Sequence, residues 1–149
     1  MIDSKDLLII DSLKKDAKAS VIAIAKKTGL PATTVHNRIK KLVDSKVITG
    51  YTITIDHKKI GKNILAYIAV TINYTEFKAN DLAQRDIARM ITKFNNVEEA
   101  SIITGGTDML IKVRVKNIEE LNKFVINELR KVMGVDSTQT MVVLQEVID

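Results

Sequence analysis

The chain of 149 residues could form one ordinary domain or two small ones, and it contains no cysteine for a disulfide or a thiolate metal site. With two histidines and no run of about 18 uncharged apolar residues, it offers neither a histidine-rich metal centre nor a membrane span, so we expect a soluble cytoplasmic protein without a metal or cofactor. The net charge of +5 is uneven, because residues 1–62 carry thirteen Lys and Arg against six Asp and Glu, whereas residues 63–149 carry ten against twelve. Such asymmetry is typical of a nucleic-acid-binding segment joined to a segment with another task.

The first part of the chain has the spacing of a helix-turn-helix. Residues 4–15 carry apolar side chains at three- and four-residue intervals, which predicts a scaffold helix. Ser20 suits the N-cap of a second helix, and Gly29 can take the left-handed conformation that ends it. Pro31 suits the first turn of a third helix, because no backbone donor is needed there. A short helix, a glycine-containing turn and another helix form the DNA-binding motif.

The third helix, residues 31–45, is the predicted DNA-reading helix. One face is apolar and packs on the other helices, and the opposite face is polar and basic. Residues near the start of such a helix lie deepest in the major groove. We therefore expect base contacts from Thr33, Thr34 and Asn37, and phosphate contacts from Lys40 and Lys41. An ordinary solvated helix would also be polar on this face, but the preceding helix and glycine turn favour DNA reading.

Two further residues of this helix are included among the DNA-binding residues with their roles left open. His36 flanks the polar face, where it is either solvated or close to a phosphate. Arg38 lies at the edge of the apolar face, so the pattern allows an internal ion pair as readily as a phosphate contact.

A short connection follows the predicted reader. Residues 51–55 alternate between polar and apolar types, which predicts a strand. The polar, basic and glycine-containing residues 56–62 predict a linker. We therefore divide the chain into a helix-turn-helix domain (residues 1–50), a strand with a linker (51–63) and a second domain (64–149).

The second domain alternates strands with helices. Strands are predicted at residues 64–74, 97–104, 109–116 and 137–147, and helices at 81–94, capped by Asn80, and from Asn117 to Gly134. The second and third strands form a hairpin closed by Gly105 to Asp108. This order is the ferredoxin-like βαββαβ pattern, in which two helices cover one face of a four-stranded antiparallel sheet. The fold class is therefore α+β, with a winged-helix-like helix-turn-helix domain followed by a ferredoxin-like domain.

The predicted sheet has one uncovered face. Its first and last strands are apolar on both sides, so the uncovered side needs a partner, and a second copy of the same sheet is the simplest one. The chain has no P-loop, dinucleotide fingerprint, HExxH motif or nucleophile elbow. We therefore do not expect an enzyme.

Taken together, the two halves resemble the Lrp/AsnC family of transcription regulators, also called feast/famine regulators, over nearly the whole chain. The resemblance rests on an ordered set of positions: Asp6, Leu13, Asp16, Ala17, Lys18, Ser20, Leu30, Val35, Arg38, Ile39, Leu42, Val47, Ile48, Gly50, Tyr51, Asp56, Gly61, Gly105, Asp108, Gly134, Val135, Thr138 and Thr140. The chain departs from the family at Lys18, Pro31 and Lys46, where Arg, Ser and Gly are common. It also departs at Thr107, where an aromatic residue often precedes the aspartate.

The resemblance implies a homodimer formed through the second domains, often assembled further into tetramers or octamers. It also implies that an amino acid or related metabolite binds between dimers near the glycine hairpin. By position, the implied effector-binding residues are Gly105, Gly106, Thr107, Asp108, Thr138 and Thr140. Turn amides can bind a carboxylate, and Asp108 can meet an ammonium group. Asp108 could equally serve only to stabilise its turn.

The leading hypothesis is a sequence-specific transcription regulator that binds pseudo-palindromic double-stranded DNA as a dimer or higher oligomer and responds to an amino acid or related small molecule. One alternative is a nucleoid-organising protein with weak sequence preference. Another is a haem-precursor decarboxylase, because a few proteins of this architecture resemble such enzymes. A decarboxylase needs acid–base groups around a large pocket, whereas the chain has no histidine after His57.

Overall fold

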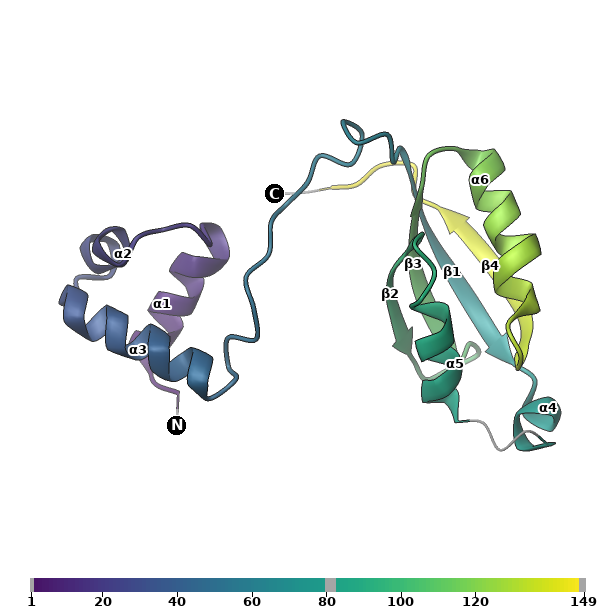
Figure 1. Ribbon diagram of the computed structural model, residues 1–149, viewed down its shortest axis with the longest axis horizontal. Helices are drawn as coiled ribbons and strands as arrows, with labels where there is room; N and C mark the ends of the chain where they lie inside the picture. The colour runs from purple at the N-terminus through teal and green to yellow at the C-terminus, as the bar shows by residue number, and fades with distance from the viewer. Residues whose placement is uncertain (1, 80–82, 148–149) are drawn as a thin grey trace. The chain divides into compact units, whose positions relative to one another are not determined.

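The computed structural model describes residues 2–79 and 83–147, and the chain divides into two compact units, Met1–Ile55 and Asp56–Asp149 (Figure 1). Each unit has its own cluster of buried apolar side chains. The domain boundaries at residues 50 and 64 remain a proposal, because compact units and functional domains need not end at the same residue. No helix in the described part of the chain is long and apolar enough to cross a membrane.

The first unit consists of three helices, α1 (Ser4–Lys15), α2 (Val21–Thr28) and α3 (Ala32–Asp44), close to the predicted bounds. Local hydrogen bonds set their ends. The Ser20 hydroxyl accepts from the Ala23 amide at 3.1 Å and caps α2. Gly29 ends α2 in the left-handed conformation, with φ of 72°. The helices enclose a small core of Ile9, Ile24, Val35 and Leu42.

The prediction of a strand over residues 51–55 is wrong. The segment has no regular secondary structure, and no strand pairs with it among the described residues. Ile53 is 73% exposed and Ile55 45% exposed. Alternation places side chains on two faces, but a strand also needs a neighbouring backbone to satisfy its amide and carbonyl groups.

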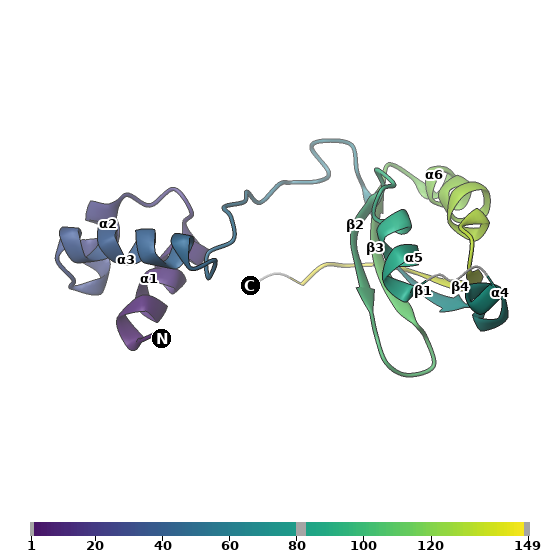
Figure 2. The ribbon, with the colours of Figure 1, turned by 60° about the horizontal axis from the view of Figure 1, so that its bottom comes forward.

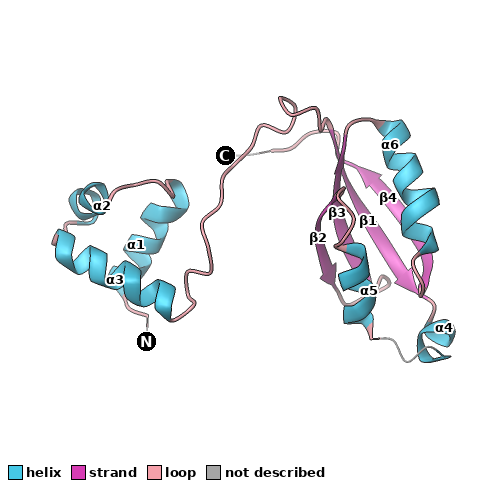
Figure 3. Ribbon diagram, viewed as in Figure 1, coloured by secondary structure: helices cyan, strands magenta, loops and turns pink. Residues whose placement is uncertain are grey.

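The second unit is a four-stranded antiparallel sheet with helices on one face (Figures 1, 2 and 3). The strand order is β2-β3-β1-β4, as the ferredoxin-like pattern predicts. The elements are β1 (Ile64–Ile72), α4 (Tyr74–Ala79), α5 (Gln84–Ile91), β2 (Val97–Ile102), β3 (Met109–Val115), α6 (Ile118–Lys123) and β4 (Val135–Val142). Figure 2 shows α5 and α6 on the same side of the sheet.

Several bounds differ from the predicted ones. The first strand ends at Ile72, because the Asn73 side chain accepts from the amides of Thr75 and Glu76 and begins the unpredicted helix α4. The second strand ends at Ile102, and the last runs over Val135–Val142 instead of residues 137–147. The helix predicted at residues 81–94 is shorter, over Gln84–Ile91, and its expected cap Asn80 lies outside the described residues.

The core of the second unit lies between the sheet and its helices. On the central strand, Ala66, Ile68 and Val70 alternate toward the helices and are fully buried. Gly134 closes one end of this core with φ of 89°. A Cβ atom there would lie 2.6 Å from Cδ1 of Ile87, so this position requires glycine for both its backbone conformation and its close approach.

Candidate nucleic-acid interface and ligand-binding cleft

The exposed face of α3 carries most of the predicted DNA-binding side chains. The side chains of Thr33, His36, Asn37, Lys40 and Lys41 are all exposed, whereas Thr34 is half-buried. Val35 and Leu42 anchor the opposite face of the helix in the core. Residues 21–46, which include α2 and α3, carry six Lys and Arg against one Asp. This combination of hydroxyl, amide and ammonium groups suits contacts to base edges and phosphates.

Arg38 makes an internal ion pair that holds α3 against the beginning of α1. Its Nη1 atom lies 2.7 Å from Oδ1 of Asp6 and 2.8 Å from Oδ2 of Asp3. Asp6 is nearly fully buried, and its other oxygen accepts from the Asp3 amide in a capping box. The pKa of Asp3 is lowered by the Asp6 amide and by Arg38, and the pKa of Arg38 is raised by Asp6 and Asp3. Of the two roles that the sequence left open, the ion pair is the one present in the structure.

The predicted effector residues of the β2–β3 hairpin lie on an exposed turn tied down by its aspartate. Gly105 and Gly106 are exposed, and Gly105 has φ of 121°. Asp108 Oδ2 accepts from the Ile72 amide at 2.8 Å, and Oδ1 accepts from the Tyr74 hydroxyl. The Asp108 carboxylate is also the main reason that the pKa of Tyr74 is raised. Asp108 therefore joins the hairpin to the end of β1 and the start of α4, as expected for a turn-stabilising residue.

The hairpin and the two predicted threonines lie on different strands. Thr138 and Thr140 are on β4, opposite Val70 and Ile68 of β1, so they point to the helix-covered side of the sheet. The Asp108 amide donates to the Val70 carbonyl at 3.1 Å, which places the start of β3 at the same level as Thr138 on the other side of β1. Thr107 is half-buried beside the exposed glycines of the turn.

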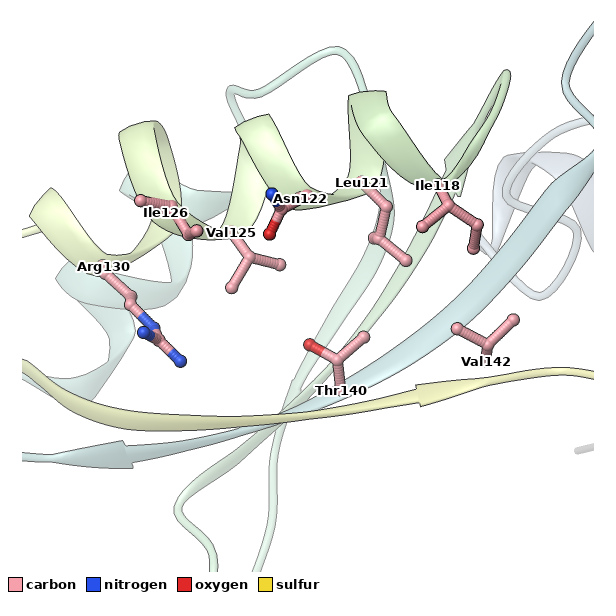
Figure 4. A pocket seen from close by; sticks show the side chains of 8 residues that line it. All are labelled: Ile118, Leu121, Asn122, Val125, Ile126, Arg130, Thr140 and Val142. Carbon is pink, nitrogen blue, oxygen red and sulfur yellow. The ribbon is translucent and has the colours of Figure 1, made fainter.

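A cleft of about 280 Å³ opens between the helical segment after Asn117 and strand β4 (Figure 4). Thr140 lines it and is the one predicted effector residue that does so. Figure 4 shows helical side chains above β4. The lining consists of Ile118, Leu121, Asn122, Val125, Ile126 and Arg130 from the helical side, and Thr140 and Val142 from the strand.

The helix above this cleft changes its winding. The helix predicted as one element begins as α6, continues as a π-helical turn over Phe124–Glu128 and ends as a 3₁₀ turn over Leu129–Lys131. In the π-helical turn the Leu129 amide donates to the carbonyl of Phe124, five residues earlier. This wider turn helps keep residues spaced by four, namely Ile118, Asn122, Ile126 and Arg130, along one side.

Sequence reasoning missed the cleft because it assigned this segment to the core. Leu121 and Val125 lie on the apolar face of this helix, and both are buried. The four-residue spacing of Ile118, Asn122 and Ile126 beside that face was the available signal. It would predict a second, partly apolar face, but not that β4 lies opposite it.

No group of three or more His, Asp or Glu residues is arranged to hold a metal ion within the described ranges 2–79 and 83–147.

Two family models match the chain. Residues 66–149 match the Lrp/AsnC ligand binding domain, and residues 2–49 match a winged helix-turn-helix DNA-binding domain. The chain belongs to the Lrp/AsnC family. The family resemblance found in the sequence and its predicted α+β fold are thereby confirmed.

The similarity to other proteins of this family extends over nearly the whole chain. The HTH-type transcriptional regulator FL11 of Pyrococcus furiosus is 36% identical over 145 residues, which cover 97% of this chain and 91% of FL11. The FL11 regulator of Pyrococcus abyssi is 38% identical over 144 residues, covering 97% and 90%. Our chain is therefore a helix-turn-helix transcription regulator of the Lrp/AsnC type with a ligand-binding domain.

Solved structures show the same architecture. AsnC of E. coli superposes with a TM-score of 0.83 at 26% identity, over 100% of this chain and 96% of AsnC. A transcriptional regulator of Neisseria meningitidis, in complex with L-Met, superposes with a TM-score of 0.90 at 24% identity, over 100% of this chain and 94% of that one. The second likeness shows that the two proteins share a fold.

Proposed function

We propose that this regulator binds a pseudo-palindromic DNA site as a homodimer or higher oligomer, with α3 of each copy in the major groove, and that a small molecule modulates the binding. The exposed face of α3 is the observation that carries this proposal. Thr33, Thr34 and Asn37 are assigned to base edges, and Lys40 and Lys41 to phosphates. His36 lies close to a phosphate, and Arg38 fixes the orientation of the helix through Asp3 and Asp6.

The second face of the sheet supports pairing with another copy. Helices cover the side of β1 that carries Ile68, so Leu65, Tyr67 and Ala69 belong to the other side. Among the described residues, no helix packs over that side (Figure 2). An isologous contact there would join two copies of α3 in one dimer, so that both half-sites of a pseudo-palindromic site can be bound together.

The modulating ligand is assigned to the second domain. The family model for residues 66–149 describes a ligand-binding domain, and the regulator of Neisseria meningitidis that shares this fold carries L-Met. An amino acid or related metabolite is therefore the first class to test. The residues assigned to it are Gly105, Gly106, Thr107, Asp108, Thr138 and Thr140, with Thr140 already at a cleft.

Selection of binding sites from random duplexes tests the DNA-reading role. We expect the wild-type chain to select a site with two related half-sites and to bind it at least about a thousandfold more tightly than random DNA at the same salt concentration. Asn37→Ala should lose preference at one position of each half-site, whereas Lys93→Ala, an exposed lysine of the second unit, should leave preference unchanged. Equal binding to selected and random DNA would instead identify a nucleoid-organising protein.

A further inference from the structure

We propose that His57 fastens the connection between the two units to the sheet in a pH-dependent manner, by pairing with Glu98 when its imidazole ring is protonated. Residues 56–62, a turn that we call the linker turn, are then held against the sheet at lower pH and released as the pH rises. Release lengthens the flexible connection to the helix-turn-helix unit and weakens simultaneous binding to two half-sites. The effect on DNA rests on the proposed function, whereas the fastening of the turn does not.

The linker turn is closed by hydrogen bonds between its own residues. The Lys62 amide donates to the His57 carbonyl at 2.9 Å, and the other backbone hydrogen bonds of the turn also join two of its residues. Within the described part of the chain, no hydrogen bond leaves the turn, and one pair of ionisable groups connects it with another segment: His57 and Glu98 of β2. The polar attachment of the turn to the sheet therefore depends on His57.

The His57 ring has an unpaired nitrogen beside this carboxylate. Among residues 2–79 and 83–147, Nδ1 of His57 is the one buried side-chain nitrogen or oxygen atom without a hydrogen-bond partner, and leaving such an atom unpaired costs free energy. It lies 3.9 Å from Oε1 of Glu98, which is too long for a hydrogen bond, but a small rotation of either side chain can shorten it. A protonated ring carries a hydrogen on both nitrogens. Protonation therefore lets Nδ1 donate to Glu98 and satisfies the unpaired atom.

Glu98 belongs to a cluster of charges at the end of the sheet where β1 begins and β4 ends (Figure 1). Nε of Arg114 on β3 donates to Oε1 of Glu98 at 2.9 Å, and Nζ of Lys112 lies 3.6 Å from Oε2 of Glu98. Arg114 also donates to Glu146, which follows β4, at 3.1 Å. The pKa of Glu146 is lowered chiefly by the hydrogen bond from Arg114, and the charges of Lys112 and His57 lower it further. His57 therefore faces charged groups from β2, β3 and the segment after β4.

Protonation of His57 adds one positive charge to this cluster, whose two carboxylates and two cations otherwise balance. In its own turn, Asp56 and Lys59 lie 3.7 Å apart and balance each other. The other charged side chains of the turn are the exposed Lys58 and the half-buried Lys62. Coulomb attraction is strongest at short range, so the Glu98 carboxylate beside Nδ1 decides the sign. Histidine changes its charge between about pH 5 and 8, so the fastening is present at the lower end of this range and is lost toward the upper end.

Release of the linker turn changes the length of the flexible connection. Residues 51–55 are already irregular and exposed, and adding residues 56–62 lengthens the free segment from five residues to twelve. The effective concentration of a second tethered binding unit falls roughly as the −3/2 power of linker length, which gives about a fourfold decrease. Affinity for a duplex with two half-sites should therefore fall by about fourfold on release, whereas affinity for a single half-site should not change.

Limited proteolysis of the full chain by thermolysin, which cleaves before isoleucine, tests the fastening directly. Ile60 lies within the linker turn and is 56% exposed, and Ile55 lies just before the turn and is 45% exposed. The ratio of the initial cleavage rates at Ile60 and Ile55, measured by mass spectrometry, cancels the pH dependence of the protease itself. We expect this ratio to rise by at least about threefold between about pH 5.5 and 8 in the wild type, because cleavage follows the population of the released turn. In His57→Gln the ratio should stay constant.

Two glutamates on β2 provide a matched pair of variants. Glu98→Gln removes the carboxylate beside the ring and should abolish the pH dependence of the cleavage ratio. Glu99→Gln removes the same charge from the next residue, whose side chain makes no hydrogen bond or ion pair within the described residues, and should keep it. A constant ratio in the wild type, a pH dependence that persists in His57→Gln, or a ratio that falls as the pH rises would overturn the proposal. Should Glu98→Gln not fold, the comparison of His57→Gln with the wild type still decides.

DNA binding by the same preparations measures the consequence and separates this inference from the proposed function. Between about pH 5.5 and 8 at constant salt, the affinity of the wild type for the selected duplex should fall by about fourfold relative to His57→Gln. His36 is present in both proteins, so its contribution cancels in this ratio, and a duplex with one half-site should give a constant ratio. A chain that selects DNA but shows a constant cleavage ratio overturns the fastening alone. A chain whose turn is released with pH but which selects no DNA overturns the proposed function alone.

Discussion

Replacing both lysines at the end of the α3 face by alanine should change the salt dependence of DNA binding in a calculable way. Lys40 and Lys41 are exposed and are assigned to phosphates. Each neutralised phosphate contributes about 0.9 to the slope of log K against log salt concentration. Two lysines in each of two copies therefore contribute about 3.6 to the slope. Between about 50 and 200 mM salt, this part alone lowers the wild-type affinity by about 150-fold.

Fluorescence anisotropy with the selected duplex, titrated at several salt concentrations, measures this slope. The double variant Lys40→Ala with Lys41→Ala should bind more weakly at low salt and lose less affinity as salt rises. The matched control, Lys93→Ala with Lys131→Ala, removes the same charge from the second unit and should keep the wild-type slope. If both double variants show the same slope, the lysines of α3 do not contact phosphates and the assignment of this face is refuted.

Three other substitutions test interactions that stabilise the two units. Arg38→Gln should lower the melting temperature of the first unit and weaken DNA binding, but leave the salt slope unchanged, because it removes an internal ion pair and no phosphate contact. Gly134→Ala should destabilise the second unit by about 2 to 5 kcal/mol in urea, the sum of left-handed backbone strain and overlap with Ile87. Arg114 lowers the pKa of Glu146, so stability from this pair is present above the ordinary pKa of 4.5 and is lost as pH falls through the lowered value. Arg114→Gln should flatten that acid dependence of unfolding.

The outcomes that would contradict these expectations are specific. A salt slope that falls by about 0.9 per copy in Arg38→Gln would mean that this residue contacts a phosphate after all. Gly61 also has positive φ, but no atom would lie within 4 Å of an added Cβ, so Gly61→Ala should cost only the backbone strain. If Gly134→Ala costs no more stability than Gly61→Ala, overlap with Ile87 does not contribute. If Arg114→Gln leaves the pH dependence of unfolding unchanged, the ion pair between Arg114 and Glu146 does not stabilise the fold.

Short-range patterns in the sequence were enough to predict helix α3 and the order of the strands along the chain. The cap at Ser20, the glycine at the end of α2 and the two faces of α3 each depend on residues within about one or two helical turns. The apolar run of β1 and the glycine loop between β2 and β3 likewise depend on residues only a few positions apart. These features arise from backbone hydrogen bonds and side-chain periodicity that are complete within one segment.

Tertiary structure decided the features that join distant segments. The sequence allowed two roles for Arg38, and the ion pair with Asp3, 35 residues away, is set by the packing of α3 on α1. The bond from the Ile72 amide to Asp108, 36 residues away, ties the hairpin to the end of β1 and could not be predicted from the hairpin alone. The cleft exists because β4 lies opposite the segment after Asn117, and the residues 51–55 remain irregular because no strand within the described chain pairs with them. Local periodicity shows which face of a segment is apolar or polar, whereas the partner of that face depends on how the whole chain packs.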